Sequence, residues 1–270
     1  MPDIIKVFFL GIVEGITEFL PISSTGHLIL FHNLFTFTDE SFSNAFDVII
    51  QLGAILSVVV LYFEKLNPLS RNKSKKENMM TLRLWIMVVI AVLPAVVLGL
   101  LFDDIIDKYL FKNTVVATTL VFWGIGIILL EKNMKKDFRI TNVNSMDVKT
   151  AFLIGCFQCL AMIPGTSRSA ATIFAAMMLG TSRTAAAEFS FFLAIPTMLG
   201  ATLLKVVKLG VSFTAGQWVL ILFGTFIAFV TALAVIRLFI GYIKNRSFTA
   251  FGIYRIILGV MVFIFTFMKK

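Results

Sequence analysis

Two polar runs lie inside apolar stretches of this chain and are similar to each other. The first spans residues 11–27 and the second spans residues 155–169. Each reads Gly-x-x-(Glu/Gln), then a short apolar stretch, a proline, a cluster of hydroxyl residues and a residue that can carry positive charge. Carboxylates, arginine and histidine are costly at membrane depth, so such residues there are functional hypotheses by default. The two runs therefore indicate where this chain does its chemistry.

Glu14 and Glu18, in the first run, are four positions apart and so share one face of a helix. Like charges this close in apolar surroundings repel, and one carboxyl group tends to hold a proton. The charged pair is stable if a divalent cation or an arginine lies between the carboxylates, and Mg²⁺ fits a site of one or two carboxylates plus substrate phosphate oxygens. We expect both residues to be catalytic and to bind the metal. The alternative is an acidic pair that faces water at the start of a helix.

Residues 164–172, in the second run, break the chain with proline and glycine and then begin an alanine-rich helix. A helix N-terminus presents unpaired N–H groups to an anion, and the planar fork of Arg168 matches phosphate oxygens. We expect Arg168 to be catalytic; the alternative is an arginine that caps the turn or extends to the interface. The neighbours expected to bind a diphosphate are Gly165, Thr166, Ser167, Ser169 and Thr172.

The matching element of the first run places hydroxyl residues and a histidine in one turn. Such a pair suggests a nucleophile with a general acid or base, and we expect Ser24 and His27 to fill these roles. His27 could instead donate to a phosphate, be the nucleophile itself, or be a buried histidine with no chemical role. Ser23 and Thr25 are expected to bind the diphosphate. Two carboxylates, an arginine, a histidine and many hydroxyls together suit phosphoryl transfer, where most of the catalysis is positioning and electrostatic stabilisation.

The composition is that of a membrane protein. Of 270 residues, 59% are hydrophobic and 14% charged, whereas a soluble domain has roughly 45–50% apolar and about 25% charged residues. Six segments approach the ~20 apolar residues that cross a bilayer: 44–63, 82–102, 113–131, 187–207, 217–240 and 251–268. An all-α polytopic membrane protein is predicted.

Residues 4–35 and 150–181 do not fit that pattern, because each holds two short apolar pieces broken by proline, glycine and hydroxyl residues. Pieces of about 10–14 residues are typical of re-entrant segments, so we expect two re-entrant helix hairpins. Matched prolines lie 143 positions apart, at 21 and 164.

Each half of the chain then holds one hairpin and three spans, about 1–135 and about 148–270. Three is an odd number, so the second half is inserted upside down. This is an inverted-topology repeat within one membrane domain, with the site near the midplane.

The net charge of +9 has its source in the loops. Residues 64–83 and 131–149 are rich in lysine and arginine, which places both in the cytoplasm by the positive-inside rule. The loop that starts at Asp103 is acidic and is expected outside, as are both termini, although Lys269 and Lys270 argue weakly against this for the C-terminus. Nucleic-acid binding is excluded because the basic segments lack interleaved aromatic residues.

At these motifs the chain resembles the undecaprenyl-diphosphatase family of bacterial inner membranes, the bacitracin-resistance type. The resemblance rests on Glu-x-x-x-Glu followed by Pro-x-Ser-Ser-Thr-Gly-His, ending at His27, and on Pro-Gly-x-Ser-Arg-Ser-x-x-Thr at residues 164–172. It covers essentially the whole chain. It implies hydrolysis of undecaprenyl diphosphate to the monophosphate carrier for cell-wall synthesis, bacitracin resistance, and a site open to the outer face.

The resemblance also implies roles for residues. Glu14 and Glu18 resemble the acidic pair tied to Mg²⁺ or Ca²⁺. Ser24 and His27 resemble the candidate nucleophile or acid/base residues, and the motif does not settle which is which. Arg168 and its hydroxyl neighbours resemble the diphosphate-binding turn.

Two other classes compete with a phosphatase of this type. A transporter or flippase of a polyprenyl-phosphate lipid shares the inverted repeat and the anion-binding half-helix. An acid-phosphatase-like lipid phosphatase needs a second, downstream histidine. No histidine follows His32, so this second class fails. The sequence leaves open a homodimer and transport of the product across the bilayer.

Overall fold

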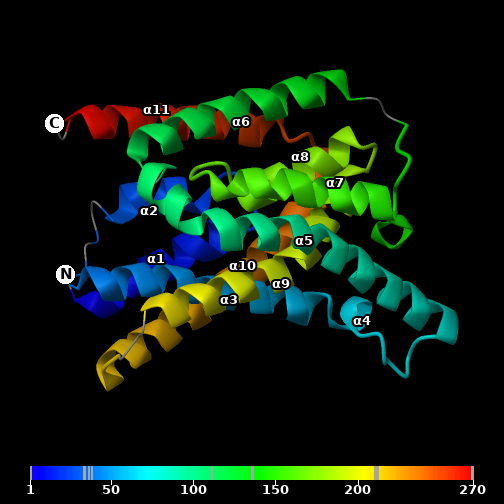
Figure 1. The fold of residues 1–270 in the computed structure, drawn as a ribbon, viewed down its shortest axis with the longest axis horizontal. Coiled ribbons are helices and arrows are strands. Elements are labelled where there is room, and N and C mark those ends of the chain that lie inside the picture. The colour runs from blue at the N-terminus through cyan, green and yellow to red at the C-terminus, as the bar shows by residue number, and fades with distance from the viewer. Residues whose placement is uncertain are drawn as a thin grey trace.

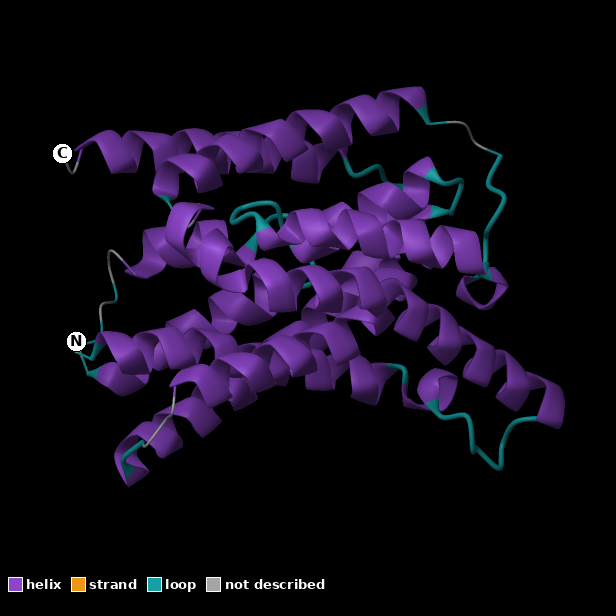
Figure 2. Cartoon of the chain, viewed as in Figure 1, coloured by secondary structure: helices purple, strands orange, loops and turns teal. Residues whose placement is uncertain are grey.

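A computed structural model describes residues 2–32, 35, 37, 39–110, 112–134, 137–209 and 213–268. These residues form helices joined by turns and loops, with one isolated bridge between Ile140 and Thr181 (Figures 1 and 2). In chain order the elements are α1 (Asp3–Thr17), α2 (Ser24–His32), α3 (Glu40–Leu61), α4 (Phe63–Leu66), α5 (Lys75–Leu110), α6 (Asn113–Asn133), η1 (Val143–Ser145), α7 (Val148–Gln158), η2 (Cys159–Met162), α8 (Arg168–Met178), α9 (Arg183–Leu209), α10 (Ala215–Asn245) and α11 (Thr249–Met268).

Six of these helices are long and apolar enough to cross a bilayer, as the sequence predicted. The crossing segments are Ser41–Leu61, Lys75–Phe102, Asn113–Asn133, Arg183–Lys208, Ala215–Asn245 and Thr249–Met268. Large apolar side chains stand exposed on their outer faces, among them Leu238 at 73% and Phe122 at 69%. Apolar surface on this scale marks contact with lipid. The chain is a multi-pass membrane protein.

Two expected loops are partly helical. The acidic segment that begins at Asp103 was predicted to be a loop, but the backbone stays helical to Leu110. Residues 103–110 contain no proline or glycine, so nothing in them breaks the helix. The basic segment 64–83 likewise holds most of α4 and the start of α5. In the acidic segment, the side chains of Asp103, Asp104 and Asp107 lie outside the described part of the chain. Residues 135, 136, 269 and 270 also lie outside it.

Residues 4–35 and 150–181 each form a pair of short helices around a turn. α1 and α2 flank the turn at residues 18–23, and α7 and α8 flank η2 and the turn at residues 163–167. In Figure 1, α2 lies toward the end of the molecule that carries both termini, and α8 lies toward the opposite end.

Several helix contacts made in the first half of the chain have a counterpart in the second half. α1 packs on α10 as α7 packs on α5, α2 packs on α11 as α8 packs on α6, and α3 packs on α9. Glycine permits close approach in two of these pairs. A Cβ atom on Gly11 would collide with the carbonyl oxygen of Gly224 on α10, and one on Gly155 would collide with that of Ala91 on α5.

Candidate active site

The two turns predicted to do the chemistry meet inside the helix bundle. The Ser169 hydroxyl donates to the carbonyl oxygen of Leu20 at 3.0 Å. The guanidinium of Arg255, on α11, donates to the carbonyl oxygens of Pro21, Gly165 and Thr166 at 3.3, 2.8 and 2.9 Å. Segments far apart in sequence are thus held side by side by a hydroxyl and a buried cation.

Ser23 and Ser167 have the same unusual backbone. They are the non-glycine residues of positive φ in the described ranges, at 73° and 69°. Each side-chain oxygen accepts from the N–H three residues on, at Gly26 and Ala170, both at 3.3 Å. A positive φ on such residues costs about 1–3 kcal/mol and persists where surrounding contacts enforce it, often at functional sites. The caps begin α2 and α8, whose N-terminal N–H groups suit an anion.

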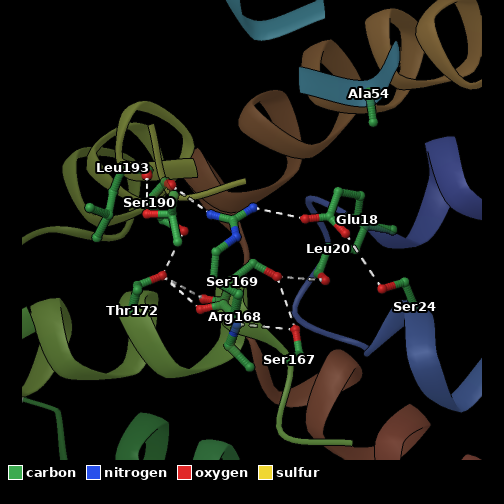
Figure 3. A network of polar contacts seen from close by, with 12 residues as sticks. Glu18, Leu20, Ser24, Ala54, Ser167, Arg168, Ser169, Thr172, Ser190 and Leu193 are labelled. Atoms are coloured by element: carbon green, nitrogen blue, oxygen red, sulfur yellow. Dashed lines mark hydrogen bonds and ion pairs between the residues drawn. The ribbon is translucent and has the colours of Figure 1, made fainter. Parts of the chain in front are cut away.

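Arg168 joins the two turns electrostatically. Its Nη2 lies 3.0 Å from Oε1 of Glu18, and its Nη1 donates to the carbonyl oxygen of Ser190 at 2.8 Å. The Ser24 hydroxyl reaches the other oxygen of the same carboxylate at 3.4 Å. Figure 3 shows the guanidinium between α9 on one side and the first turn on the other. The side chains of Arg168 and Glu18 are 11% and 6% exposed, so this ion pair is buried.

The hydroxyls of the second turn hold one another and the backbone of Arg168. Ser167 Oγ and Ser169 Oγ are 3.0 Å apart. Thr172 Oγ1 lies 2.9 Å from the carbonyl oxygen of Arg168 and 2.7 Å from Oγ of Ser190 (Figure 3). Thr172 therefore links the backbone of Arg168 to the side chain of Ser190 on α9.

The other residues predicted to bind diphosphate lie in or beside the same turns. Thr166 is buried, and its carbonyl, like that of Gly165, is bound by Arg255. Thr25 is half-buried in the first turn of α2, directly after Ser24.

Glu14 lies one helical turn before Glu18 and is fully buried. Neither of its carboxylate oxygens has a hydrogen-bond partner in the described part of the chain. Its counterpart Gln158 accepts from Thr197 at 3.5 Å, and its amide nitrogen also lacks a partner there. Buried carboxylates are normally paired or bound to a metal.

The donor set fits a cation only in part. Within the described ranges, no group of three or more His, Cys, Asp or Glu residues could hold a metal ion. Two carboxylates could hold Mg²⁺ when substrate oxygens or waters supply the remaining ligands.

Cys156 and Cys159 are free and half-buried, and the Cys159 thiol donates to the carbonyl of Gly155 at 3.4 Å.

His27 is held by both of its ring nitrogens. Nδ1 lies 2.7 Å from the carbonyl oxygen of Ser23, and Nε2 lies 2.7 Å from the hydroxyl of Tyr254. The two rings stack, with centroids 5.6 Å apart and planes inclined by 10°. The histidine is 6% exposed. Both nitrogens are therefore engaged by groups other than Ser24.

The site contains residues that the sequence analysis did not select: Ser190, Tyr254 and Arg255. Arg255 carried a usable signal, because an arginine inside the apolar run 251–268 is costly in lipid. Its side chain is 0% exposed. Ser190 and Tyr254 carried no such signal, since both are ordinary residues of a membrane helix.

Comparison with known proteins gives a consistent result. The family model described as "Bacitracin resistance protein BacA" matches residues 7–261. A protein of Fusobacterium nucleatum named "Undecaprenyl-diphosphatase" is 52% identical over 266 residues, 96% of this chain and 98% of the relative. "Undecaprenyl-diphosphatase 1" of Clostridioides difficile is 49% identical over 267 residues, 98% of this chain and 97% of the relative. The chain therefore belongs to the BacA family of bacitracin resistance proteins.

Proposed function

We propose that this protein hydrolyses undecaprenyl diphosphate to undecaprenyl phosphate and inorganic phosphate in the bacterial cell membrane. The relatives named for this activity match nearly the whole chain. The observation that carries the proposal is the buried contact of Arg168 with Glu18, with Ser24 on the second carboxylate oxygen. The product would return to peptidoglycan synthesis, and this recycling would confer resistance to bacitracin.

Arg168 and the two capped turns would bind the diphosphate. The guanidinium can take two phosphate oxygens at once, and the N-termini of α2 and α8 add N–H donors and positive dipole. Ser167 and Ser169, at the start of α8, add hydroxyls. Because Glu18 already occupies one edge of the guanidinium, an entering phosphate would share or replace that contact.

Ser24 suits the nucleophile and Glu18 its base. The Ser24 Oγ would attack the terminal phosphorus, its proton passing to Glu18, while the bond from that phosphorus to the bridging oxygen breaks. Undecaprenyl phosphate leaves with the electron pair of that bond. Glu18 passes the first proton to an oxygen of the departing phosphate. Water then attacks the phosphoserine while Glu18 accepts a proton from it and returns that proton to the Ser24 oxygen as the bond from phosphorus to Oγ breaks, which releases inorganic phosphate and free Ser24. His27 is a poorer nucleophile here because both of its nitrogens are engaged.

A divalent cation would be held by Glu14 and Glu18, with substrate oxygens completing its ligands. The buried, unpartnered oxygens of Glu14 support this assignment. When bound, Mg²⁺ or Ca²⁺ would neutralise the charge of the diphosphate and so favour departure of the monophosphate.

The two halves would form an inverted repeat, with re-entrant hairpins that enter from opposite faces. The exchange of matching helix partners supports this arrangement. The short helix pairs also lie toward opposite ends of the molecule (Figure 1). The basic segments 64–83 and 131–149 would face the cytoplasm, and the termini and the opening of the site would face outward.

Cysteine labelling tests this topology in a Cys156→Ala/Cys159→Ala background. Ser74→Cys and Thr214→Cys place one thiol each at exposed positions in a basic segment and before α10. A membrane-impermeant maleimide added to intact cells should label position 214 and not position 74. Equal labelling at both positions contradicts the arrangement.

The catalytic proposal is tested by phosphate release from undecaprenyl diphosphate by purified protein. Arg168→Ala should lower the rate by about 10³-fold or more, as expected for loss of a phosphate-stabilising cation. Arg237→Ala, an exposed arginine of α10, is the matched control and should keep wild-type turnover. Wild-type protein that binds the lipid but releases no phosphate would favour a transporter or flippase.

A further inference from the structure

We propose that Tyr254 is a positioning residue of this site, which holds the ring of His27 by donating to Nε2 and through it fixes the peptide that carries Ser24. The kinetic part of this inference rests on the proposed phosphatase function. The structural part does not. Tyr254 lies on α11, far from either polar run in sequence.

The hydrogen bonds of His27 determine which nitrogen carries the proton. The carbonyl oxygen of Ser23, 2.7 Å from Nδ1, can only accept, so Nδ1 must carry a hydrogen. In a neutral ring Nε2 is then an acceptor, and the Tyr254 hydroxyl at 2.7 Å donates to it. Burial of the ring, and after it the nearby guanidinium of Arg255, disfavour a positive charge on His27 and so favour the neutral ring.

This contact reaches Ser24 through one peptide group. The carbonyl that His27 binds belongs to the peptide bond between Ser23 and Ser24. Ser23 is in the strained conformation with φ of 73°, so that peptide needs external contacts to hold it. Tyr254, His27 and the Ser23 carbonyl thus form a line of hydrogen bonds that fixes where the Ser24 hydroxyl lies relative to Glu18.

The surroundings of Tyr254 distinguish its hydroxyl from its ring. The residue is 44% exposed on α11, a helix apolar enough to cross the bilayer, so part of it is open to contact with lipid. A phenylalanine would serve that contact and the stacking on His27 equally well. Only the hydroxyl distinguishes tyrosine from phenylalanine at this position, and it donates to Nε2 of His27.

The experiment is ¹⁵N NMR of selectively histidine-labelled protein. The chain has two histidines, so His32→Gln leaves His27 as the single imidazole signal. In this background Nδ1 should show the one-bond proton coupling and Nε2 should not. Tyr254→Phe should leave the proton on Nδ1, because the Ser23 carbonyl still requires it, and should move the Nε2 resonance downfield, because Nε2 loses its hydrogen-bond donor. Tyr242→Phe, which removes a hydroxyl from α10, is the matched control and should leave the signal unchanged.

Kinetics supply the second readout. Tyr254→Phe should lower kcat by about 10- to 100-fold with KM within about twofold of wild type, as expected for a misplaced reacting group. A wild-type His27 that carries its proton on Nε2 overturns the inference. So does a Tyr254→Phe variant whose Nε2 resonance and turnover are both those of the wild type. If wild-type protein releases no phosphate, the proposed function fails, while the Nε2 resonance still decides whether Tyr254 donates to His27.

Discussion

Nη2 of Arg168 lies 3.0 Å from Oε1 of Glu18, and both side chains are largely buried. The cation expected to bind phosphate is thus paired with the carboxylate proposed as base. Breaking a buried ion pair by removing one partner costs about 3–5 kcal/mol, because the other charge is left uncompensated. This one contact therefore contributes both to the stability of the fold and to the proposed catalysis.

Arg168→Ala should both abolish hydrolysis and destabilise the protein by about 3–5 kcal/mol, since Glu18 loses its partner in a buried ion pair. The double variant Arg168→Ala/Glu18→Gln should recover most of this stability and stay inactive. Thermal unfolding in detergent and phosphate release measure the two effects. A single variant as stable as wild type would show that the ion pair contributes nothing to the fold.

Phosphate should be trapped on Ser24 during turnover. Substrate labelled in its terminal phosphate, quenched within one turnover and digested, should give a labelled peptide that contains Ser24. Ser24→Ala should give no labelled protein and no phosphate release, with the fold unchanged because this half-buried hydroxyl makes only a long contact of 3.4 Å. Label found on His27 instead would make the histidine the nucleophile.

Arg255→Met should unfold the protein more easily, by about 2–4 kcal/mol, because carbonyl groups of both turns lose their buried donor. Arg255→Lys keeps the charge but cannot reach three carbonyls with a planar fork, so its stability should lie between those of Arg255→Met and wild type. Both variants should lose turnover along with stability. Wild-type melting of Arg255→Met would mean that the two turns hold together without this tie.

Removal of divalent cations with EDTA should stop hydrolysis, and Mg²⁺ should restore it. Isothermal titration of the substrate-free protein with Mg²⁺ should give weak binding that strengthens when inorganic phosphate is present, because the protein offers two carboxylates and few other ligands. Glu14→Gln should weaken that binding. Full activity in chelator would separate Glu14 and Glu18 from any metal role.

Asp147, which caps α7 outside the spans, should make stability depend on acid pH. Burial opposes the shift, but the Thr150 N–H, the Arg139 guanidinium and the Thr150 hydroxyl bind the carboxylate and lower the pKa of Asp147 from 3.8 to about 2. A lowered pKa means that the carboxylate stabilises the fold above pH about 4 and that this contribution is lost as pH falls through about 2.

Asp147→Ala should therefore lower the melting temperature at neutral pH by a few degrees, as expected for loss of a cap worth about 1 kcal/mol. Its difference from wild type should narrow below pH about 4. Asp147→Asn keeps a capping side chain and should lie between the two proteins. A difference that is constant down to pH about 2 would contradict the shift.

The sequence predicted the long helices well and the ends of some helices poorly. Span 113–131 lies within α6 and span 251–268 within α11, because an apolar run of this length can only cross the bilayer as a helix. The loop expected from Asp103 is helical instead. Charge marks where a helix leaves the lipid, but residues 103–110 hold no glycine or proline that would end the helix there.

The amino-acid sequence by itself determined the membrane class and the motif residues, because burying Glu14, Glu18 or Arg168 in lipid is too costly without a function. Only the tertiary structure decided which of these groups meet. The pairing of Arg168 with Glu18, the tie from Arg255 and the hydroxyl of Tyr254 on His27 all join distant helices. Such contacts depend on how helices pack across the bundle, and neither periodicity nor local spacing along the chain encodes that.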